Sequence, residues 1–149
     1  MKIKTLRPEY VKHVPEALND GVLYISEEFE TAGHLCCCGC GEEIFTPLNR
    51  AQWTLLKNRQ TGTISLFPSI GNWKYACRSH YWIKNNLVID AGDMSNKAIN
   101  AVIKRDQRDR LALAKESNQR IAQTTAAVDS KPVEQRGVLA RFLRRLRGS

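Results

Sequence analysis

The stretch His34-Leu-Cys-Cys-Cys-Gly-Cys-Gly41 carries four of the chain's five cysteines, and the fifth opens the segment Cys77-Arg-Ser-His80. Two short segments rich in thiol and imidazole groups, separated by a strand or two, are typical of zinc sites in small domains. Zinc takes four nitrogen or sulfur ligands in a tetrahedron, and the glycines allow the backbone to bend around the metal. The pattern therefore predicts a metal centre, with zinc as the cofactor.

The two segments hold more candidate ligands than zinc needs. In an extended segment alternate residues share a face, so Cys36, Cys38 and Cys40 would lie together while Cys37 points away. A competing register uses Cys37-x-x-Cys40, the usual knuckle spacing. We rank the candidate ligands as Cys38, Cys40, Cys77 and His80, then Cys36, and finally His34 and Cys37.

Other uses of these cysteines are less favoured. A disulfide framework is unattractive because five cysteines is an odd number, adjacent cysteines pair poorly and residues 1–20 contain no export signal. An iron–sulfur cluster, a catalytic metal or a spare thiol nucleophile with His34 or His80 as its base stays open. The chain has no paired catalytic carboxylates, phosphate-binding glycine loop or nucleophile elbow. An enzyme is therefore uncertain, and we expect a non-enzymatic protein in preference.

Residues 1–94 contain short apolar runs bounded by Gly, Pro, Asn or Asp, a pattern that is typical of short strands. These runs lie at residues 21–26, 43–46, 63–67, 81–83 and 87–90. Asn85-Asn86 and the Gln60–Gly62 stretch are suited to hairpin turns. We predict an α+β protein in which residues 1–94 form a small antiparallel, β-rich zinc-binding domain of five to seven strands.

Residues 95–149 read as a basic helical extension, with Ser95 as the N-cap of a first helix and a linker near residues 123–132. A last helix follows at about residues 133–146. The net charge of +8 lies entirely in this extension, because residues 1–94 carry ten basic and ten acidic side chains. One face of the last helix presents a group of arginines, Arg141, Arg144, Arg145 and Arg147. The charge suggests an acidic partner for this extension, whether nucleic acid, an anionic membrane or another protein. For the last helix we prefer the ordinary alternative, docking on the protein's own domain or on a dimer partner.

An aromatic segment surrounds the second ligand group. Trp73, Arg78 and Trp82 are the residue types that most often anchor protein partners, so we predict a partner-binding surface there. The alternative is that the aromatic rings form a small core around the metal, since compact zinc domains have few bulky apolar residues.

Several strings in this chain together resemble a bacterial family of unknown function. They are Tyr24-Ile-Ser-Glu-Glu-Phe29, His34-Leu-Cys36, Cys38-Gly-Cys-Gly41, Thr46-Pro-Leu48, Pro68-Ser-Ile-Gly-Asn-Trp73 and Cys77-Arg-Ser-His-Tyr-Trp-Ile83. Members of that family lie in gene neighbourhoods beside ubiquitin-like proteins, ubiquitin-activating and ubiquitin-conjugating enzyme homologues, and JAB-type metallo-deubiquitinases. The resemblance covers roughly residues 20–95.

The resemblance implies a zinc-stabilised accessory of a bacterial ubiquitin-like modification system. It implies Cys36, Cys38, Cys40, Cys77 and His80 as the ligand set, because the family pattern carries Pro where this chain has Cys37. We expect a cytoplasmic adaptor without a transmembrane segment that binds a ubiquitin-like protein, an activating or conjugating enzyme, or a JAB peptidase. A nucleic-acid-binding zinc protein and a metal- or thiol-dependent hydrolase are the alternatives.

Overall fold

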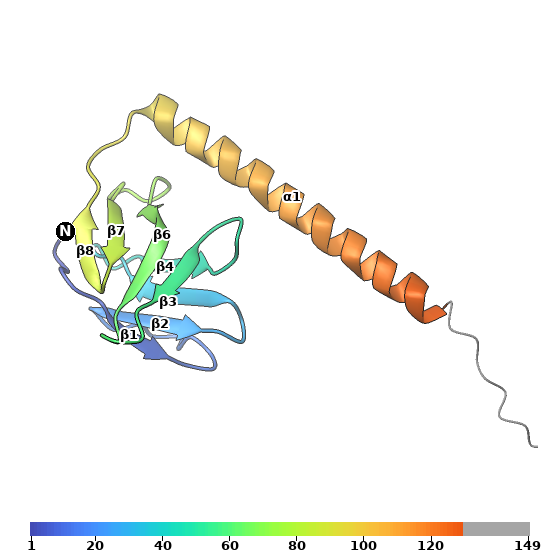
Figure 1. Cartoon of the computed structure of the whole chain (residues 1–149). Coiled ribbons are helices and arrows are strands. Elements are labelled where there is room, and N and C mark those ends of the chain that lie inside the picture. Colours follow the sequence, from blue (N-terminus) through green and yellow to red (C-terminus); the bar gives the residue numbers. More distant parts are fainter. Residues whose placement is uncertain (130–149) are drawn as a thin grey trace, which may run out of the picture. The chain divides into compact units, whose positions relative to one another are not determined.

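Figure 1 shows the computed structural model, which describes residues 1–129. Eight strands precede one helix. In chain order they are β1 (Arg7–Tyr10), β2 (Val22–Ser26), β3 (Thr31–Leu35), β4 (Glu43–Pro47), β5 (Thr54–Lys57), β6 (Ile64–Gly71), β7 (His80–Lys84), β8 (Leu87–Asp90) and α1 (Asn96–Asp129).

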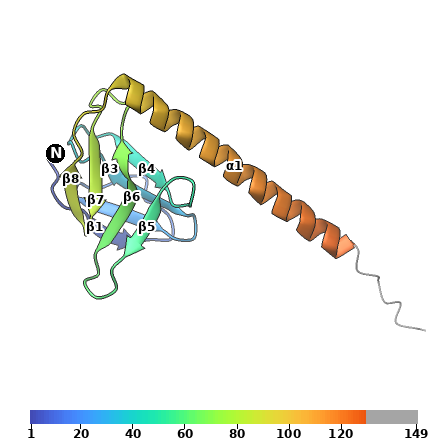
Figure 2. The same ribbon diagram turned by 45° about the horizontal axis from the view of Figure 1, so that its top comes forward.

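The strands form two four-stranded sheets, ordered β1-β2-β3-β4 and β5-β6-β7-β8, which lie as two layers (Figures 1 and 2). Every neighbouring pair is antiparallel except β1 and β2, which run parallel. Both sheets contribute to one core, because alternate strand residues point inward and exclude water. Fully buried examples are Leu23 and Ile25 from the first sheet, and Leu66, Tyr81 and Ile83 from the second.

The predicted α+β class with a β-rich first part and a helical second part is confirmed, but the strand count was too low. The apolar pattern missed β1, β3 and β5, whose sequences are short and partly polar. β3 contains Gly33 because Val14 and Phe45 pack where a side chain would lie. A glycine chosen for packing weakens the strand signal that periodicity detects.

The predicted hairpin turns occur where expected. Asn85 and Asn86 have φ of 48° and 68° between β7 and β8, and Gly62 has φ of 69° between β5 and β6. Asn and Gly adopt this left-handed conformation more readily than other residues.

Helix α1 begins as predicted, with the Ser95 hydroxyl accepting a hydrogen bond from the Ala98 N–H at 3.3 Å. It continues through residues 123–129, part of the expected linker, where the Thr124 and Thr125 hydroxyls donate to carbonyls four residues back. The expected helix at residues 133–146 lies outside the described residues. The chain divides into two units, Met1–Leu113 and Ala114–Ser149. Within residues 1–129, no helix is both long and apolar enough to cross a membrane.

Candidate functional site

Four cysteines from the two predicted segments meet in space. The sulfurs of Cys36, Cys38, Cys40 and Cys77 all lie within 4.8 Å of one another. The Cys36 sulfur is 3.4 Å from that of Cys38 and 4.0 Å from that of Cys77. Four sulfurs bound tetrahedrally to zinc at about 2.3 Å would be roughly 3.8 Å apart, so this donor set fits zinc. The same distances are far longer than a disulfide bond.

The backbone turns of this four-cysteine cluster explain how one short segment supplies three sulfurs. The chain leaves β3 at Leu35 and turns, with the Gly39 N–H donating to the Cys36 carbonyl at 2.9 Å. Gly39 and Gly41 have φ of 86° and 87°, which other residues rarely adopt. The segment is therefore a turn and not the extended strand that we considered, although Cys36, Cys38 and Cys40 still lie together and Cys37 lies apart. Three backbone N–H groups, those of Cys40, Glu42 and Ser79, donate to the sulfurs of Cys38, Cys40 and Cys77 respectively.

One thiol of the cluster, that of Cys77, has a pKa below its ordinary value. Burial opposes ionisation of Cys77, but hydrogen bonds from the backbone and hydroxyl of Ser79 outweigh it and lower the pKa of Cys77 to about 7. Burial raises the pKa of Cys38 to about 12 in the metal-free cluster. Metal binding requires the thiolates, so a bound cation would supply the stabilisation that Cys38 lacks.

Asn72 and Ser79 support the cluster from behind. The Asn72 amide donates to the Ser79 hydroxyl at 2.9 Å and to the Cys36 sulfur at 3.4 Å. The Ser79 hydroxyl lies 3.1 Å from the Cys36 sulfur. Both residues are buried. Such groups behind the ligands orient them and tune a metal site.

Cys37 and His34 lie apart from the cluster, in the core between the sheets. Both are fully buried. Burial raises the pKa of the Cys37 thiol to about 12 and lowers the pKa of His34 to about 4. Each is therefore neutral at pH 7, which suits a place in the core.

His80 is not brought to the four-cysteine cluster, although we ranked it among the first four ligands. Its Nε2 lies 2.9 Å from the Ser69 hydroxyl, and its Nδ1 lies 3.0 Å from the Gly92 carbonyl oxygen. Both ring nitrogens are thus engaged elsewhere, and Cys36 stands with the other three sulfurs instead. The spacing in Cys77-x-x-His80 fits a ligand pair, but residue 80 already belongs to β7, which aims the imidazole away from the sulfurs.

These two contacts determine which nitrogen of His80 carries the proton. A carbonyl oxygen only accepts hydrogen bonds, so Nδ1–H must donate to Gly92. In a neutral imidazole Nε2 then has a free lone pair and accepts the Ser69 O–H. A serine hydroxyl that donates to such an imidazole can attack an acyl carbon while the imidazole takes its proton. The Gly92 carbonyl keeps the ring in the required tautomer.

A bulge in β6 brings Ser69 to His80. The pairing of β6 with β7 is in one register at Leu66↔Ile83 and in another at Ile70↔Tyr81, so extra residues of β6 lie between these pairs. Ser69 is one of them. Bulges of this kind redirect side chains and are frequent beside active sites. Gly92 in turn is held by Asp90, whose carboxylate accepts the Gly92 N–H at 2.9 Å.

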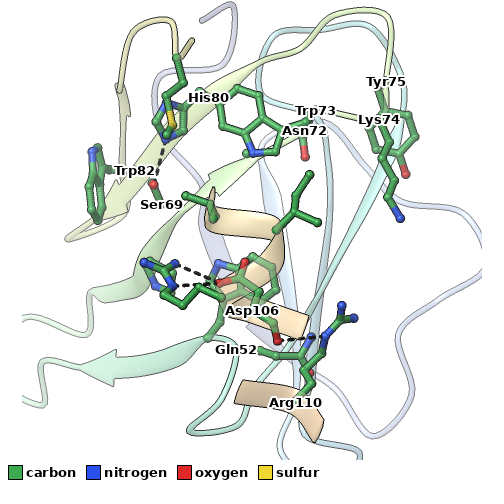
Figure 3. A pocket seen from close by; sticks show the side chains of 17 residues that line it. Gln52, Ser69, Asn72, Trp73, Lys74, Tyr75, His80, Trp82, Asp106 and Arg110 are labelled. Atoms are coloured by element: carbon green, nitrogen blue, oxygen red, sulfur yellow. Dashed lines mark hydrogen bonds and ion pairs between the residues drawn. The ribbon is translucent and has the colours of Figure 1, made fainter. Parts of the chain in front are cut away.

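Ser69 and His80 line a cavity of about 560 Å³ (Figure 3). Trp53, Trp73 and Trp82 give this cavity apolar walls, and residues of the first turns of α1 line it as well. Figure 3 shows the Ser69–His80 hydrogen bond with the Trp73 indole beside the imidazole. The cavity is large enough to take a segment of a peptide next to the hydroxyl.

The predicted partner-binding residues separate into two groups. Trp73 and Trp82 line the cavity, whereas Arg78 is exposed and donates to the Asn96 side chain at 3.0 Å. The predicted anion-binding arginines lie outside the described residues. These are Arg141, Arg144, Arg145 and Arg147.

Sequence reasoning missed Ser69. Its only signal was the string Pro68-Ser-Ile-Gly-Asn-Trp73, which combines a serine with glycine and tryptophan ahead of a nearby histidine. We read the string as part of the aromatic segment, because no local pattern links a serine in one strand to a histidine in the next.

Comparison with known proteins now agrees with this geometry. Residues 10–90, more than half of the chain, match the family described as bacterial ubiquitination-like system serine protease (BubE). This range holds Ser69, His80 and all four clustered cysteines. No curated protein and no solved structure shows a significant match to the chain. The chain belongs to the bacterial ubiquitination-like system serine protease family, BubE.

Proposed function

We propose that this protein is a serine peptidase that cleaves a ubiquitin-like protein of its own modification system, with Ser69 as nucleophile and His80 as general base. The observation that carries the proposal is the pair of hydrogen bonds from Ser69 through His80 to the Gly92 carbonyl, at 2.9 and 3.0 Å. The family description supports both the reaction and the setting.

The reaction follows from these contacts. The Ser69 oxygen bonds to the scissile carbonyl carbon while its proton passes to Nε2 of His80. The resulting imidazolium donates that proton to the leaving amine as the carbon–nitrogen bond breaks. Water then attacks the Ser69 ester, gives its proton to Nε2, and the proton returns to the Ser69 oxygen. The Nδ1–H bond to Gly92 holds the ring throughout both steps.

We assign the four-cysteine cluster to a structural zinc. Four cysteines fill all four positions of a tetrahedral zinc and leave none for a reacting water, which is how structural sites differ from catalytic ones. The metal would hold Cys77, and Cys77 lies three residues before His80. Its contribution is therefore to keep the segment that carries the base in place.

Peptidase activity takes precedence over the non-enzymatic adaptor that the sequence favoured. An adaptor would need no serine aligned with a histidine inside an apolar cavity. Binding of the ubiquitin-like protein remains part of the proposal, because the substrate has to dock before it is cleaved. The conjugating and activating enzymes and the JAB peptidase are then neighbours in the pathway and not substrates.

The test compares full-length wild type with Ser69→Ala and His80→Gln. The assays are labelling by a fluorophosphonate probe and cleavage of the system's ubiquitin-like protein carrying a C-terminal extension. We expect both rates to fall by at least ~100-fold in the two variants. Ser65→Ala is the matched control, because Ser65 is also half-buried on β6 but does not line the cavity.

Zinc content and the melting temperature should be unchanged in Ser69→Ala. Cleavage that persists in this variant would exclude a Ser69 mechanism. If Ser69→Ala still binds the ubiquitin-like protein and wild type cleaves nothing, the adaptor is the correct function.

A further inference from the structure

The two hydrogen bonds of His80 leave one motion of its ring open. They act at Nδ1 and Nε2, in the plane of the ring, and no steric contact on their part opposes a rotation of the ring about its Cβ–Cγ bond. This rotation moves both nitrogens away from their partners and weakens both hydrogen bonds, because their strength falls as the distance grows and as the donor angle departs from linear. A side chain packed against the ring would oppose it.

Trp73 makes that contact. The centroid of its indole lies 4.9 Å from that of the His80 imidazole, with 55° between the ring planes. Figure 3 shows the indole directly beside the imidazole, on the wall of the cavity. Both side chains are half-buried, so each loses water-exposed surface to the other.

Gly71 provides the space in which the indole lies. Gly71 is the residue of β6 that pairs with His80 of β7. A Cβ added to Gly71 would lie within 2.5 Å of three indole atoms, Nε1, Cε2 and Cζ2. The φ of Gly71 lies outside the left-handed region, so this position requires the absence of a side chain and not glycine's backbone freedom.

The geometry points to Gly71 and Trp73 as the pair that positions the general base. Gly71 leaves room beside the β7 backbone, the Trp73 indole fills it, and the indole holds the His80 ring in line with Ser69. Both are positioning residues, since neither contacts the reacting atoms. The inference rests on the proposed function and adds to it the residues that make His80 competent.

The first experiment measures fluorophosphonate labelling of Ser69 in the full-length chain. The probe is small and needs no ubiquitin-like protein, so its rate reports the serine and histidine alone. We expect Gly71→Ala and Trp73→Ala each to lower the labelling rate by roughly 10- to 100-fold, because small displacements of catalytic groups have effects of this size. Trp73→Phe should restore most of the rate, since a phenyl ring can also pack against the imidazole.

The double variant Gly71→Ala/Trp73→Ala tests the mechanism. If alanine at position 71 acts only by displacing the indole, it has nothing to displace once Trp73 is gone. The double variant should therefore label as fast as Trp73→Ala alone, a strong departure from additivity. Rates that multiply would overturn the link between the two residues.

Gly33→Ala is the matched control for crowding. A Cβ there would lie 2.9 Å from the Val14 Cγ1 and 3.1 Å from the Phe45 Cε1, in the other sheet and away from the cavity. It should lower the melting temperature without changing the labelling rate, measured well below that temperature. An equal loss of labelling in Gly33→Ala would mean that general destabilisation explains the effect.

A second measurement does not depend on activity. The ¹⁵N spectrum of the imidazoles, with His80 assigned from the His80→Gln variant, reports the tautomer and its fixity. Wild type should show the Nδ1–H tautomer, and Trp73→Ala should show averaging of the two. An unchanged His80 signal and labelling rate in Trp73→Ala would overturn the inference, as would an effect confined to KM for the protein substrate.

The two proposals fail in distinguishable ways. Equal labelling of wild type and Ser69→Ala would remove the proposed function, whatever Trp73 does. Normal Ser69-dependent labelling in Trp73→Ala would remove only the positioning role.

Discussion

His34 and Tyr81 form a buried pair that joins the two sheets and takes no part in the proposed reaction. Nε2 of His34 lies 2.8 Å from the Tyr81 hydroxyl, and both side chains are fully buried. Nδ1 of His34 has no hydrogen-bond partner within the described part of the chain. Because burial lowers the pKa of His34 to about 4, the ring is neutral at pH 7. Within the described residues, the Tyr81 hydroxyl is therefore the hydrogen-bond partner of the buried His34 ring.

Tyr81→Phe should lower the free energy of unfolding by about 1–3 kcal/mol, the usual effect of leaving a buried polar group unpaired. Tyr24→Phe is the control, because its hydroxyl accepts from the side chain of exposed Asn19 at 2.9 Å and water can replace that contact. Urea denaturation of both variants measures the difference. Equal losses would show that the His34 contact contributes nothing of its own.

Among the elements, the β7–β8 hairpin does more than connect two strands. The Asn86 N–H donates to the Ile64 carbonyl at 2.9 Å, and the Asn86 side-chain oxygen accepts the Ile64 N–H at 2.8 Å. The Asn86 carbonyl also accepts the Leu6 N–H at 2.8 Å. The turn thereby fixes the start of β6 and the N-terminal segment. β6 carries Ser69 five residues further on.

Asn86→Gly keeps the left-handed conformation but removes the side-chain acceptor. The N–H of buried Ile64 then loses its partner, and we expect a loss of about 1–3 kcal/mol in unfolding free energy. Asn85→Gly should be nearly neutral, because the Asn85 side-chain oxygen accepts only a long hydrogen bond, at 3.4 Å, from the half-buried Thr63 hydroxyl. The two variants have the same change of residue at neighbouring positions. Thermal denaturation of both therefore separates the contribution of backbone conformation to stability from the contribution of the side-chain hydrogen bond.

At the scale of the whole molecule, the four-cysteine cluster spans the two layers. Cys36, Cys38 and Cys40 follow β3 of the first sheet, while Cys77 precedes β7 of the second. A bound metal would therefore cross-link the sheets in addition to fixing the segment that leads into His80. Since such sites seldom exist in the unfolded chain, metal binding adds directly to folding free energy.

Removal of zinc by a chelator should lower the melting temperature and abolish fluorophosphonate labelling of Ser69 together. Cys38→Ser should do the same, since it removes one ligand. Cys37→Ala should keep one zinc per chain, because its thiol lies in the core and not in the cluster. Elemental analysis and thermal melts provide the readouts. A metal-free protein with unchanged melting and labelling would show that the packed sheets hold the site without the metal.

Local patterns were enough to establish much of this protein. The two cysteine-bearing segments, the asparagine turn at residues 85–86 and the start of α1 at Ser95 all depend on residues close in sequence. The conformational preferences of these residues act over one turn or one loop, so they can be predicted from the sequence alone. The same holds for the β-rich first part, although packing constraints hid strands such as β3.

The choice among the candidate ligands and the use of His80 depend on contacts between distant segments. A turn after β3 gathers three sulfurs, and Cys77 reaches them across the sheets, so that the His80 imidazole lies outside the cluster. The bulge in β6 then places Ser69 opposite the imidazole, and the loop after β8 supplies the Gly92 carbonyl. Each contact joins residues that lie on different strands or loops, and strand register and bulges are set by the packing of both sheets together. That is why the spacing of Cys77 and His80, which is typical of metal ligands, was visible in the sequence, while the role proposed for the histidine was not.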